Sequence, residues 1–321
     1  MHAIWRRGIV LASAGLALAS AAVAQTPPGQ PSSGPGGSSY PHASYTVTTN
    51  GSGRLQYWVY QPASPKPASA PLVVLNHGAN ADDPSTYIAW LEHLVRRGNV
   101  VVFPRYQATA LTPPSTYTDN AITAVKNAIT WLQASGTRVQ PQLNRFAIAG
   151  HSYGGVVTVN MGQRWQSAGL PQPRALMPVE PWYQNIDASL AAIPSSTFLN
   201  CFVGGGDSFA GRAGCDLIWD RTGHVSAANR DYVWMYSDTY GTPDLIADHA
   251  APTADPGGSS YAVVNALDWN GFWKTFDGLS DCAFFGTNCP YGLGNSAEHR
   301  GLGLWSDGTP VTPMLISDVK P

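Results

Sequence analysis

Short continuous apolar runs alternate along the chain with longer segments in which apolar residues recur at helical intervals. The runs at 72–75 and 100–103 consist of Leu, Val and Phe alone, which is typical of parallel strands buried on both faces. The segment 119–134 places apolar residues every three or four positions, which predicts a helix with one apolar face. The same pattern predicts further strands at 146–149, 174–180, 196–203 and 231–236, and further helices at 82–97, 156–166, 208–221 and 261–279.

Two β-rich runs, 45–49 and 55–61, precede this alternation. Gly51 and Gly53 lie between them, which predicts an antiparallel hairpin. Strands that alternate with helices through right-handed crossovers form a mostly parallel sheet with helices on both faces. The sequence therefore predicts an α/β fold, with a mostly parallel central sheet and an N-terminal antiparallel hairpin.

The N-terminal region has the features of an export signal followed by a linker. Arg6 and Arg7 precede an apolar run at 8–23, and small residues end the run as at a signal-peptidase site. Residues 25–44 are mainly Pro, Gly, Ser and Gln, which bury too little apolar surface to order a segment. We predict a signal peptide over 1–24, a disordered leader over 25–44, and a single domain over 45–321 with a C-terminal extension from about residue 280. The protein is expected to be secreted or periplasmic.

Charge and hydropathy exclude two kinds of partner. Only 12% of the residues are charged, the formal net charge is −2, and no basic run is present to follow a phosphate backbone. Nucleic acid is therefore not an expected partner. After the predicted signal peptide, no segment has the roughly 20 apolar residues of a membrane span, so stable membrane insertion is not expected.

Four cysteines lie in the C-terminal half, at Cys201, Cys215, Cys282 and Cys289. An even number in an exported chain favours disulfides, with three possible connectivities. Pairing of sequence neighbours, Cys201 with Cys215 and Cys282 with Cys289, is the most economical. A metal site is the alternative, but the chain has no C-x-x-C and no histidine pair near these positions, so no metal is predicted.

The pattern G-x-S-x-G occurs at 150–154, directly after the apolar run at 146–149. In a strand-to-helix turn, such glycines let the backbone fold back and expose the central serine, here Ser152, as a nucleophile. An ordinary glycine turn is the alternative. Because a serine hydroxyl needs a base, and the base needs a carboxylate, the remaining candidates are His and Asp residues at the carboxyl ends of strands.

Asp207 follows the predicted strand at 196–203 in a glycine-rich loop and is the predicted acid, with a helix N-cap as its alternative role. Glu180, at the end of the preceding strand, is a reserve candidate. The predicted base is His249, in a loop after the strand at 231–236, with an ordinary polar loop residue as the alternative. His224 comes too soon after Asp207, and His299 lies beyond the last predicted helix.

An acyl-transfer site also needs backbone N–H donors for the oxyanion. Tyr153, directly after the serine, should supply one, and Ala79 or Gly78, after the strand at 72–75, the other. Trp182 and Tyr183 follow the strand at 174–180, where aromatic side chains could line a substrate pocket. Ordinary packing at the rim is the equal alternative.

These motifs together resemble those of secreted α/β-hydrolases of the dienelactone-hydrolase and chlorophyllase-like kind, which border the bacterial cutinase-type polyester hydrolases. The resemblance rests on the residues at 75–78, 150–154, 206–207 and 247–252. It implies an α/β-hydrolase fold, ester hydrolysis, and a triad of Ser152, Asp207 and His249. The chain departs from dienelactone hydrolases proper in having serine where they have a cysteine nucleophile.

The predicted function is that of a secreted serine carboxylic-ester hydrolase that acts through an acyl-enzyme on Ser152. No cofactor is needed, and the substrate is expected to be a small-molecule ester, a lipid or a polyester. Because the histidine must be neutral to act as a base, activity should rise through a pH of about 6.5. The alternatives are a serine peptidase or amidase of the same fold, and a non-catalytic binding protein on a hydrolase scaffold.

Overall fold

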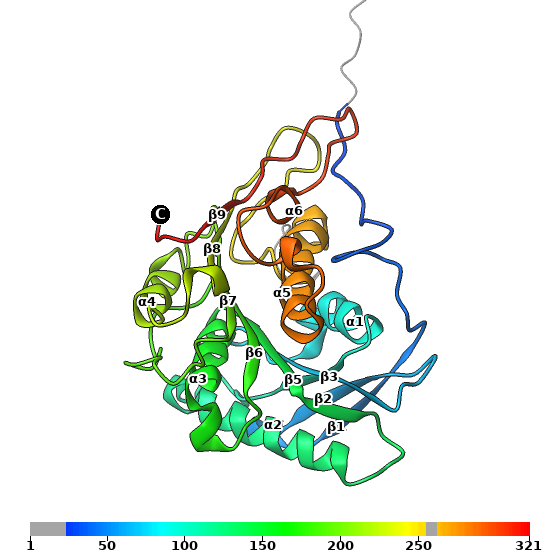
Figure 1. Cartoon of the computed structure of the whole chain (residues 1–321), viewed down its shortest axis with the longest axis vertical. Helices are drawn as coiled ribbons and strands as arrows, with labels where there is room; N and C mark the ends of the chain where they lie inside the picture. The colour runs from blue at the N-terminus through cyan, green and yellow to red at the C-terminus, as the bar shows by residue number, and fades with distance from the viewer. Residues whose placement is uncertain (1–23, 255–261) are drawn as a thin grey trace, which may run out of the picture.

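A computed structural model describes residues 24–254 and 262–321 (Figure 1). All of the predicted signal peptide except Ala24 lies outside these residues. The named strands form one nine-stranded sheet, in the order β1-β2-β4-β3-β5-β6-β7-β8-β9. They are β1 (Tyr45–Asn50), β2 (Tyr57–Pro62), β3 (Ser69–Asn76), β4 (Val100–Pro104), β5 (Gln140–His151), β6 (Pro173–Val179), β7 (Phe198–Gly204), β8 (Arg230–Met235) and β9 (Leu315–Ser317).

The predicted α/β fold is confirmed. Strands β3 to β8 are parallel to their neighbours among themselves, and β1 and β2 form the antiparallel hairpin at one edge. The strand β3 is buried on both faces, as its apolar run predicted: Leu72 and Val74 pack in one core, and Val73 and Leu75 in the other.

Helices cover both faces of the sheet (Figure 1). Side chains of α2, α3 and α4 pack in the core on one face, and those of α1 and α5 in the core on the other. The helices are α1 (Ile88–Arg96), α2 (Tyr117–Gln133), α3 (Tyr153–Ala168), α4 (Ala213–Arg221), α5 (Lys274–Phe285) and α6 (Ala297–Arg300). A turn of π-helix, Asp268–Trp273, leads into α5, and a short 3-10 helix, Pro84–Tyr87, leads into α1.

The structure differs from the sequence prediction at the C-terminal end of the chain. Strand β9 pairs antiparallel with β8, so the predicted extension completes the edge of the sheet. A three-residue strand has too little alternation to be recognised in the sequence.

A second difference concerns the helix predicted over 208–221. This helix begins only at Ala213, because the amides of Phe209 and Ala210 donate to Asp207 Oδ1 in a tight turn.

The structure also differs at residues 25–44, which the composition predicted to be disordered. This segment lies against the domain. The buried N–H of Gly36 donates to Asp277 Oδ2 (2.7 Å), and the amide of Thr242 donates to the carbonyl of Gln25 (2.7 Å). The segment has little apolar surface of its own, which is all that composition shows. Its backbone groups nevertheless form hydrogen bonds with groups of the folded domain.

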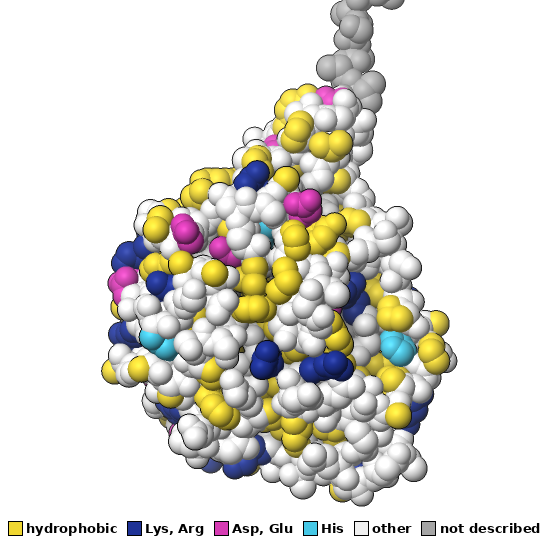
Figure 2. Space-filling view, in the orientation of Figure 1, with side chains coloured by type: hydrophobic (Ala, Val, Ile, Leu, Met, Phe, Trp, Pro, Cys, Tyr) yellow, Lys and Arg dark blue, Asp and Glu magenta, His cyan; other side chains and the backbone are white. Residues whose placement is uncertain are grey.

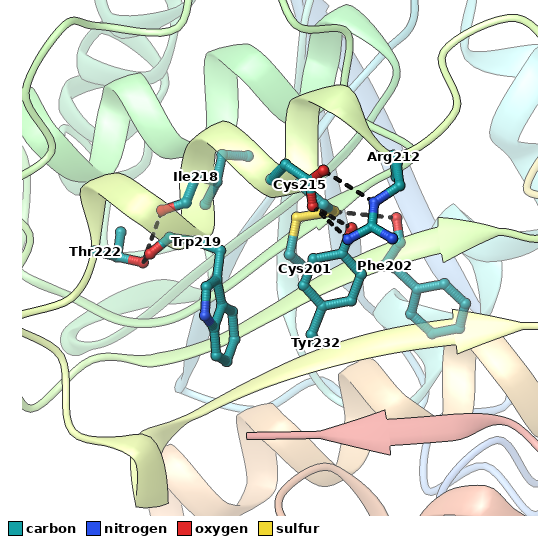
Figure 3. Close-up of a disulfide and its surroundings, with 9 residues drawn as sticks. Cys201, Phe202, Arg212, Cys215, Ile218, Trp219, Thr222 and Tyr232 are labelled. Carbon is teal, nitrogen blue, oxygen red and sulfur yellow. Dashed lines mark hydrogen bonds and ion pairs between the residues drawn. A yellow bond between two sulfur atoms is a disulfide. The ribbon is translucent and has the colours of Figure 1, made fainter. Parts of the chain in front are cut away.

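Two disulfides are present, and their connectivity is compatible with pairing of sequence neighbours. Cys201 in β7 joins Cys215 in α4, with a Cα–Cα distance of 5.6 Å (Figure 3). Cys282 in α5 joins Cys289. The Cys201–Cys215 bridge closes a loop that contains Asp207. Closing a loop of this size restricts the unfolded chain by about 3 kcal/mol. The bridge therefore anchors the segment that carries the predicted acid.

Few charged side chains are present on the surface, in keeping with the 12% of charged residues in the sequence. On the face shown in Figure 2, basic and acidic side chains are scattered among uncharged ones. Within the described residues, no helix combines the length and apolar character that a bilayer crossing requires.

Candidate active site

Ser152 lies at the sharp turn between β5 and α3, the strand–turn–helix context that the motif predicted. Its backbone has φ 57° and ψ −122°, a conformation that non-glycine residues rarely adopt. Three backbone hydrogen bonds hold it there: Ser152 N–H donates to Val179, and Ser152 C=O accepts from Gly155 and Trp182. The turn is thus fixed by both neighbouring segments, and the side chain of Ser152 faces a cavity.

The glycines of the motif are required by close backbone approaches. A Cβ on Gly154 would lie 2.2 Å from the carbonyl oxygen of Asn76, and one on Gly150 would lie 2.3 Å from the carbonyl oxygen of Gly154. These obstacles are backbone atoms, which cannot move aside as a flexible side chain can. The end of β3 therefore packs directly against the start of α3, and this brings residues 77–79 beside Ser152.

Replacing Gly154 with Ala should lower the free energy of unfolding by about 1–3 kcal/mol, because the added methyl overlaps a buried carbonyl. Denaturant unfolding measures this change. The matched control is Gly136→Ala, where no atom of residues 24–254 or 262–321 lies within 4 Å of the added atom. That control should change stability by about 0.5 kcal/mol or less. Equal stability of the two variants would show that the close packing at the turn is not required.

The structure brings the predicted base and acid to Ser152. His249 Nε2 lies 3.0 Å from Ser152 Oγ, and His249 Nδ1 lies 2.8 Å from Asp207 Oδ2. The three residues are far apart in sequence, and each follows a different strand at the carboxyl edge of the sheet. One ring nitrogen of His249 therefore faces a hydroxyl and the other a carboxylate, as in a Ser-His-Asp triad.

Both carboxylate oxygens of Asp207 are used. Oδ2 faces His249, while Oδ1 accepts from the amides of Phe209 (2.8 Å) and Ala210 (2.9 Å). Burial alone would raise the pKa of Asp207, but the hydrogen bonds from His249 and these amides hold it below its ordinary value. Capping, the alternative role predicted for Asp207, therefore applies only to Oδ1. This oxygen caps a turn and not α4, because the N-cap of α4 is Arg212.

The structure separates the two candidates for the second oxyanion donor. The N–H of Gly78 donates to Tyr87 Oη (2.9 Å), so it is already occupied. The N–H of Ala79 has no acceptor among the described residues. The N–H of Tyr153 is at the first position of α3, where no intrahelical acceptor exists. Ala79 and Tyr153 are therefore better placed than Gly78 to donate to an oxyanion.

A cavity of about 580 Å³ opens in front of Ser152 and His249. Its lining is largely apolar and includes Trp182, Phe209 and Tyr87. The Trp182 and Phe209 rings lie 5.2 Å apart. Phe209 was not predicted from the sequence, although its position two residues after Asp207 is a signal that could have identified it.

Trp182 and Tyr183, predicted together as pocket residues, have different positions. Trp182 lines the cavity, whereas Tyr183 does not and is 43% exposed. The Tyr183 ring packs against Trp182 with centroids 4.9 Å apart. The pocket prediction is thus compatible with Trp182, and the alternative of rim packing describes Tyr183.

His224 and His299, the histidines that the sequence placed outside the site, do not line the cavity, whereas His151 does. His224 Nε2 lies 2.8 Å from the carbonyl of Ile193, and the buried His299 lies 3.0 Å from that of Gly294. His151, Glu180 and His249 place possible ligand atoms within 4.8 Å of one another, close enough for a metal ion. However, His249 Nδ1 in this group already faces Asp207.

Comparison with known families agrees with this fold. Residues 77–242, just over half of the chain, match a family described as having the alpha/beta hydrolase fold. The chain belongs to this family of hydrolases. A search of curated proteins finds no match to the hydrolase.

Proposed function

We propose that this hydrolase is a secreted serine esterase, which cleaves carboxylic esters through an acyl-enzyme on Ser152. The observation that carries the proposal is the hydrogen-bonded chain from Ser152 through His249 to Asp207, at the wall of a largely apolar cavity. Within the family, the motifs at 75–78, 150–154 and 247–252 favour the dienelactone-hydrolase and chlorophyllase-like group with its cutinase-type relatives. The N-terminal signal and the two disulfides favour export.

In the first half of the reaction, His249 Nε2 removes the proton of Ser152 Oγ as the oxygen attacks the ester carbonyl. The carbonyl oxygen becomes an oxyanion, which accepts hydrogen bonds from the N–H groups of Tyr153 and Ala79. The tetrahedral intermediate then collapses, the bond to the alcohol oxygen breaks, and His249 gives its proton to that oxygen. Asp207 keeps the proton on His249 Nδ1 throughout and stabilises the imidazolium.

In the second half, a water molecule attacks the acyl-enzyme and His249 accepts one of its protons. The second tetrahedral intermediate releases the carboxylic acid, and the proton returns from His249 to Ser152 Oγ. Over the two halves, one ester and one water molecule are converted to an acid and an alcohol, and the side chains return to their starting protonation states. The reaction involves no oxidation or reduction.

An ester and its matched amide distinguish esterase from amidase activity. We expect the wild type to cleave a nitrophenyl ester and to leave the corresponding nitroanilide largely intact, and we expect Ser152→Ala to cleave neither. Faster cleavage of the anilide would favour a peptidase or amidase. A folded wild type that cleaves neither substrate would favour a binding protein on a hydrolase scaffold.

Replacing Trp182 with Ala should change substrate preference more than stability, because its ring lines the cavity. We expect the kcat/KM for a bulky acyl ester to fall about tenfold to a hundredfold relative to that for an acetate ester. The control is Tyr183→Ala, which removes an aromatic ring of similar size outside the cavity. If both variants shift the ratio equally, Trp182 does not shape the pocket.

A further inference from the structure

Glu180, directly after β6, is an unusual residue for its surroundings. Its side chain is completely buried, yet neither Oε1 nor Oε2 has a hydrogen-bond partner among the described residues. Buried carboxyl groups are costly unless they are paired. Its backbone has a φ of 47°, a conformation uncommon for a residue other than glycine. Two unfavourable features at one position beside a candidate active site point to a role beyond packing.

The fold makes room for this carboxyl group. A Cβ on Gly204, at the end of β7, would lie 2.3 Å from Glu180 Oε1. The N–H of Glu180 donates to the carbonyl of Phe202 (2.7 Å), which holds the turned backbone against β7. The backbone at the ends of β6 and β7 therefore fixes the position of this carboxyl group beside the candidate active site.

Two histidines lie close to the Glu180 carboxyl group. Glu180 Oε2 lies 3.7 Å from His249 Nδ1, the nitrogen that also faces Asp207, and 3.4 Å from His151 Nε2. Tyr87 Oη accepts from Gly78 N–H and lies 2.9 Å from His151 Nδ1. The other ring nitrogen of His151, Nε2, faces Glu180. Burial lowers the pKa of His151 well below its ordinary value and keeps the ring neutral.

We propose that Glu180 is a second acid for His249: a positioning residue that supports Asp207 at the Nδ1 edge of the ring and replaces it when Asp207 is absent. The proposal rests on the proposed function of the Ser152 site. In this arrangement the proton stays on His249 Nδ1 and is shared with Glu180 instead of Asp207, while Ser152 still transfers its proton to His249 Nε2. The 3.7 Å separation shortens as the ring becomes positively charged, as catalytic contacts often do during reaction.

The charged groups around Glu180 explain why it stays in reserve. Burial raises the pKa of Glu180 well above its ordinary value, and the negative charges of Asp207 and Asp248 raise it further. Protonation of Glu180 is therefore easier while Asp207 is present than when its charge is removed. Removing Asp207 removes one of these charges, which favours ionisation of Glu180 beside His249.

A double-mutant cycle with Asp207→Ala, Glu180→Gln and the double variant tests the proposal. Removing Glu180 should cost roughly ten- to a hundredfold more in kcat/KM in the Asp207→Ala background than in the wild type, the size of coupling that contacting residues show. The acid-side loss of activity in Asp207→Ala should reflect proton uptake by Glu180 in addition to that by His249. The double variant should keep only the loss caused by protonation of His249, because glutamine does not titrate. A merely structural role would give neither the coupling nor a difference between the two pH profiles.

Thermal unfolding of each variant establishes that it is folded. If Asp207→Ala does not fold, Asp207→Ser replaces it, since a hydroxyl can still accept from the amides that Asp207 Oδ1 binds. Equal kcat/KM of the folded single and double variants at every pH, beside an active wild type, overturns the role of Glu180 alone. A folded wild type without Ser152-dependent ester hydrolysis overturns the proposed function, and the role of Glu180 with it.

Discussion

Replacing Ser152 with Ala should lower kcat for a nitrophenyl ester on the order of a million-fold, the loss typical of removing the nucleophile of a triad. The reason is geometric: Ser152 Oγ lies 3.0 Å from His249 Nε2 at the wall of the cavity. The residual rate would come from the oxyanion donors and substrate binding alone. Steady-state kinetics with single-turnover measurements on the purified variant give this value.

The variant should remain folded, because alanine removes only the hydroxyl and the backbone contacts of the turn are kept. Ser167→Ala is the matched control: Ser167 lies in the last turns of the same helix, and its hydroxyl donates to the carbonyl of Arg164. That control should hydrolyse the ester at the wild-type rate. If Ser152→Ala retained more than about one percent of the wild-type rate, a loss far smaller than a nucleophile's, Ser152 would not be the acyl carrier.

Replacing Asp207 with Asn should lower kcat by about 10⁴-fold while leaving the fold intact. The introduced carbonyl oxygen can still accept from Phe209 and Ala210, but the introduced amide would donate to His249 Nδ1. The proton of His249 would then lie on Nε2, where it blocks removal of the Ser152 proton. Glu180 does not restore the original tautomer of His249, because the introduced amide would lie closer to Nδ1 than Glu180 does.

The control for this substitution is Asp220→Asn. Asp220 pairs with Lys320 at the surface and does not line the cavity. We expect wild-type activity from that variant across the pH range. Equal rates for the Asp207 and Asp220 variants would show that Asp207 does not set the tautomer of His249.

The sequence carried more information on the sheet and on the polar residues at strand ends than on contacts across the molecule. Continuous apolar runs such as 72–75 predict buried strands because both faces of the strand are covered. Asp207 and His249 could be found because parallel strands deliver their carboxyl ends to one edge. Composition could not show that Gly36 pairs with the buried Asp277, which is 241 residues away.

Finer features of the site depended on contacts that no local pattern encodes. Gly78 and Ala79 were equivalent in the sequence, and only the hydrogen bond from Gly78 to Tyr87 separates them. Trp182 and Tyr183 are adjacent, yet only Trp182 lines the cavity. Glu180 was recognised as a candidate acid from its place at a strand end. Its distance to His249, and the fact that its carboxylate has no hydrogen-bond partner in the described part of the chain, could come only from the folded structure.

Labelling with a fluorophosphonate tests the central claim most directly, because this reagent reacts with an activated serine rather than with an exposed hydroxyl. The wild type should gain one phosphonyl group, which peptide mass spectrometry should locate on Ser152, and ester hydrolysis should be lost in step with labelling. Ser152→Ala should remain unlabelled under the same conditions. A folded and active wild type that is unlabelled at Ser152, or that is labelled on another residue as activity is lost, would contradict the account.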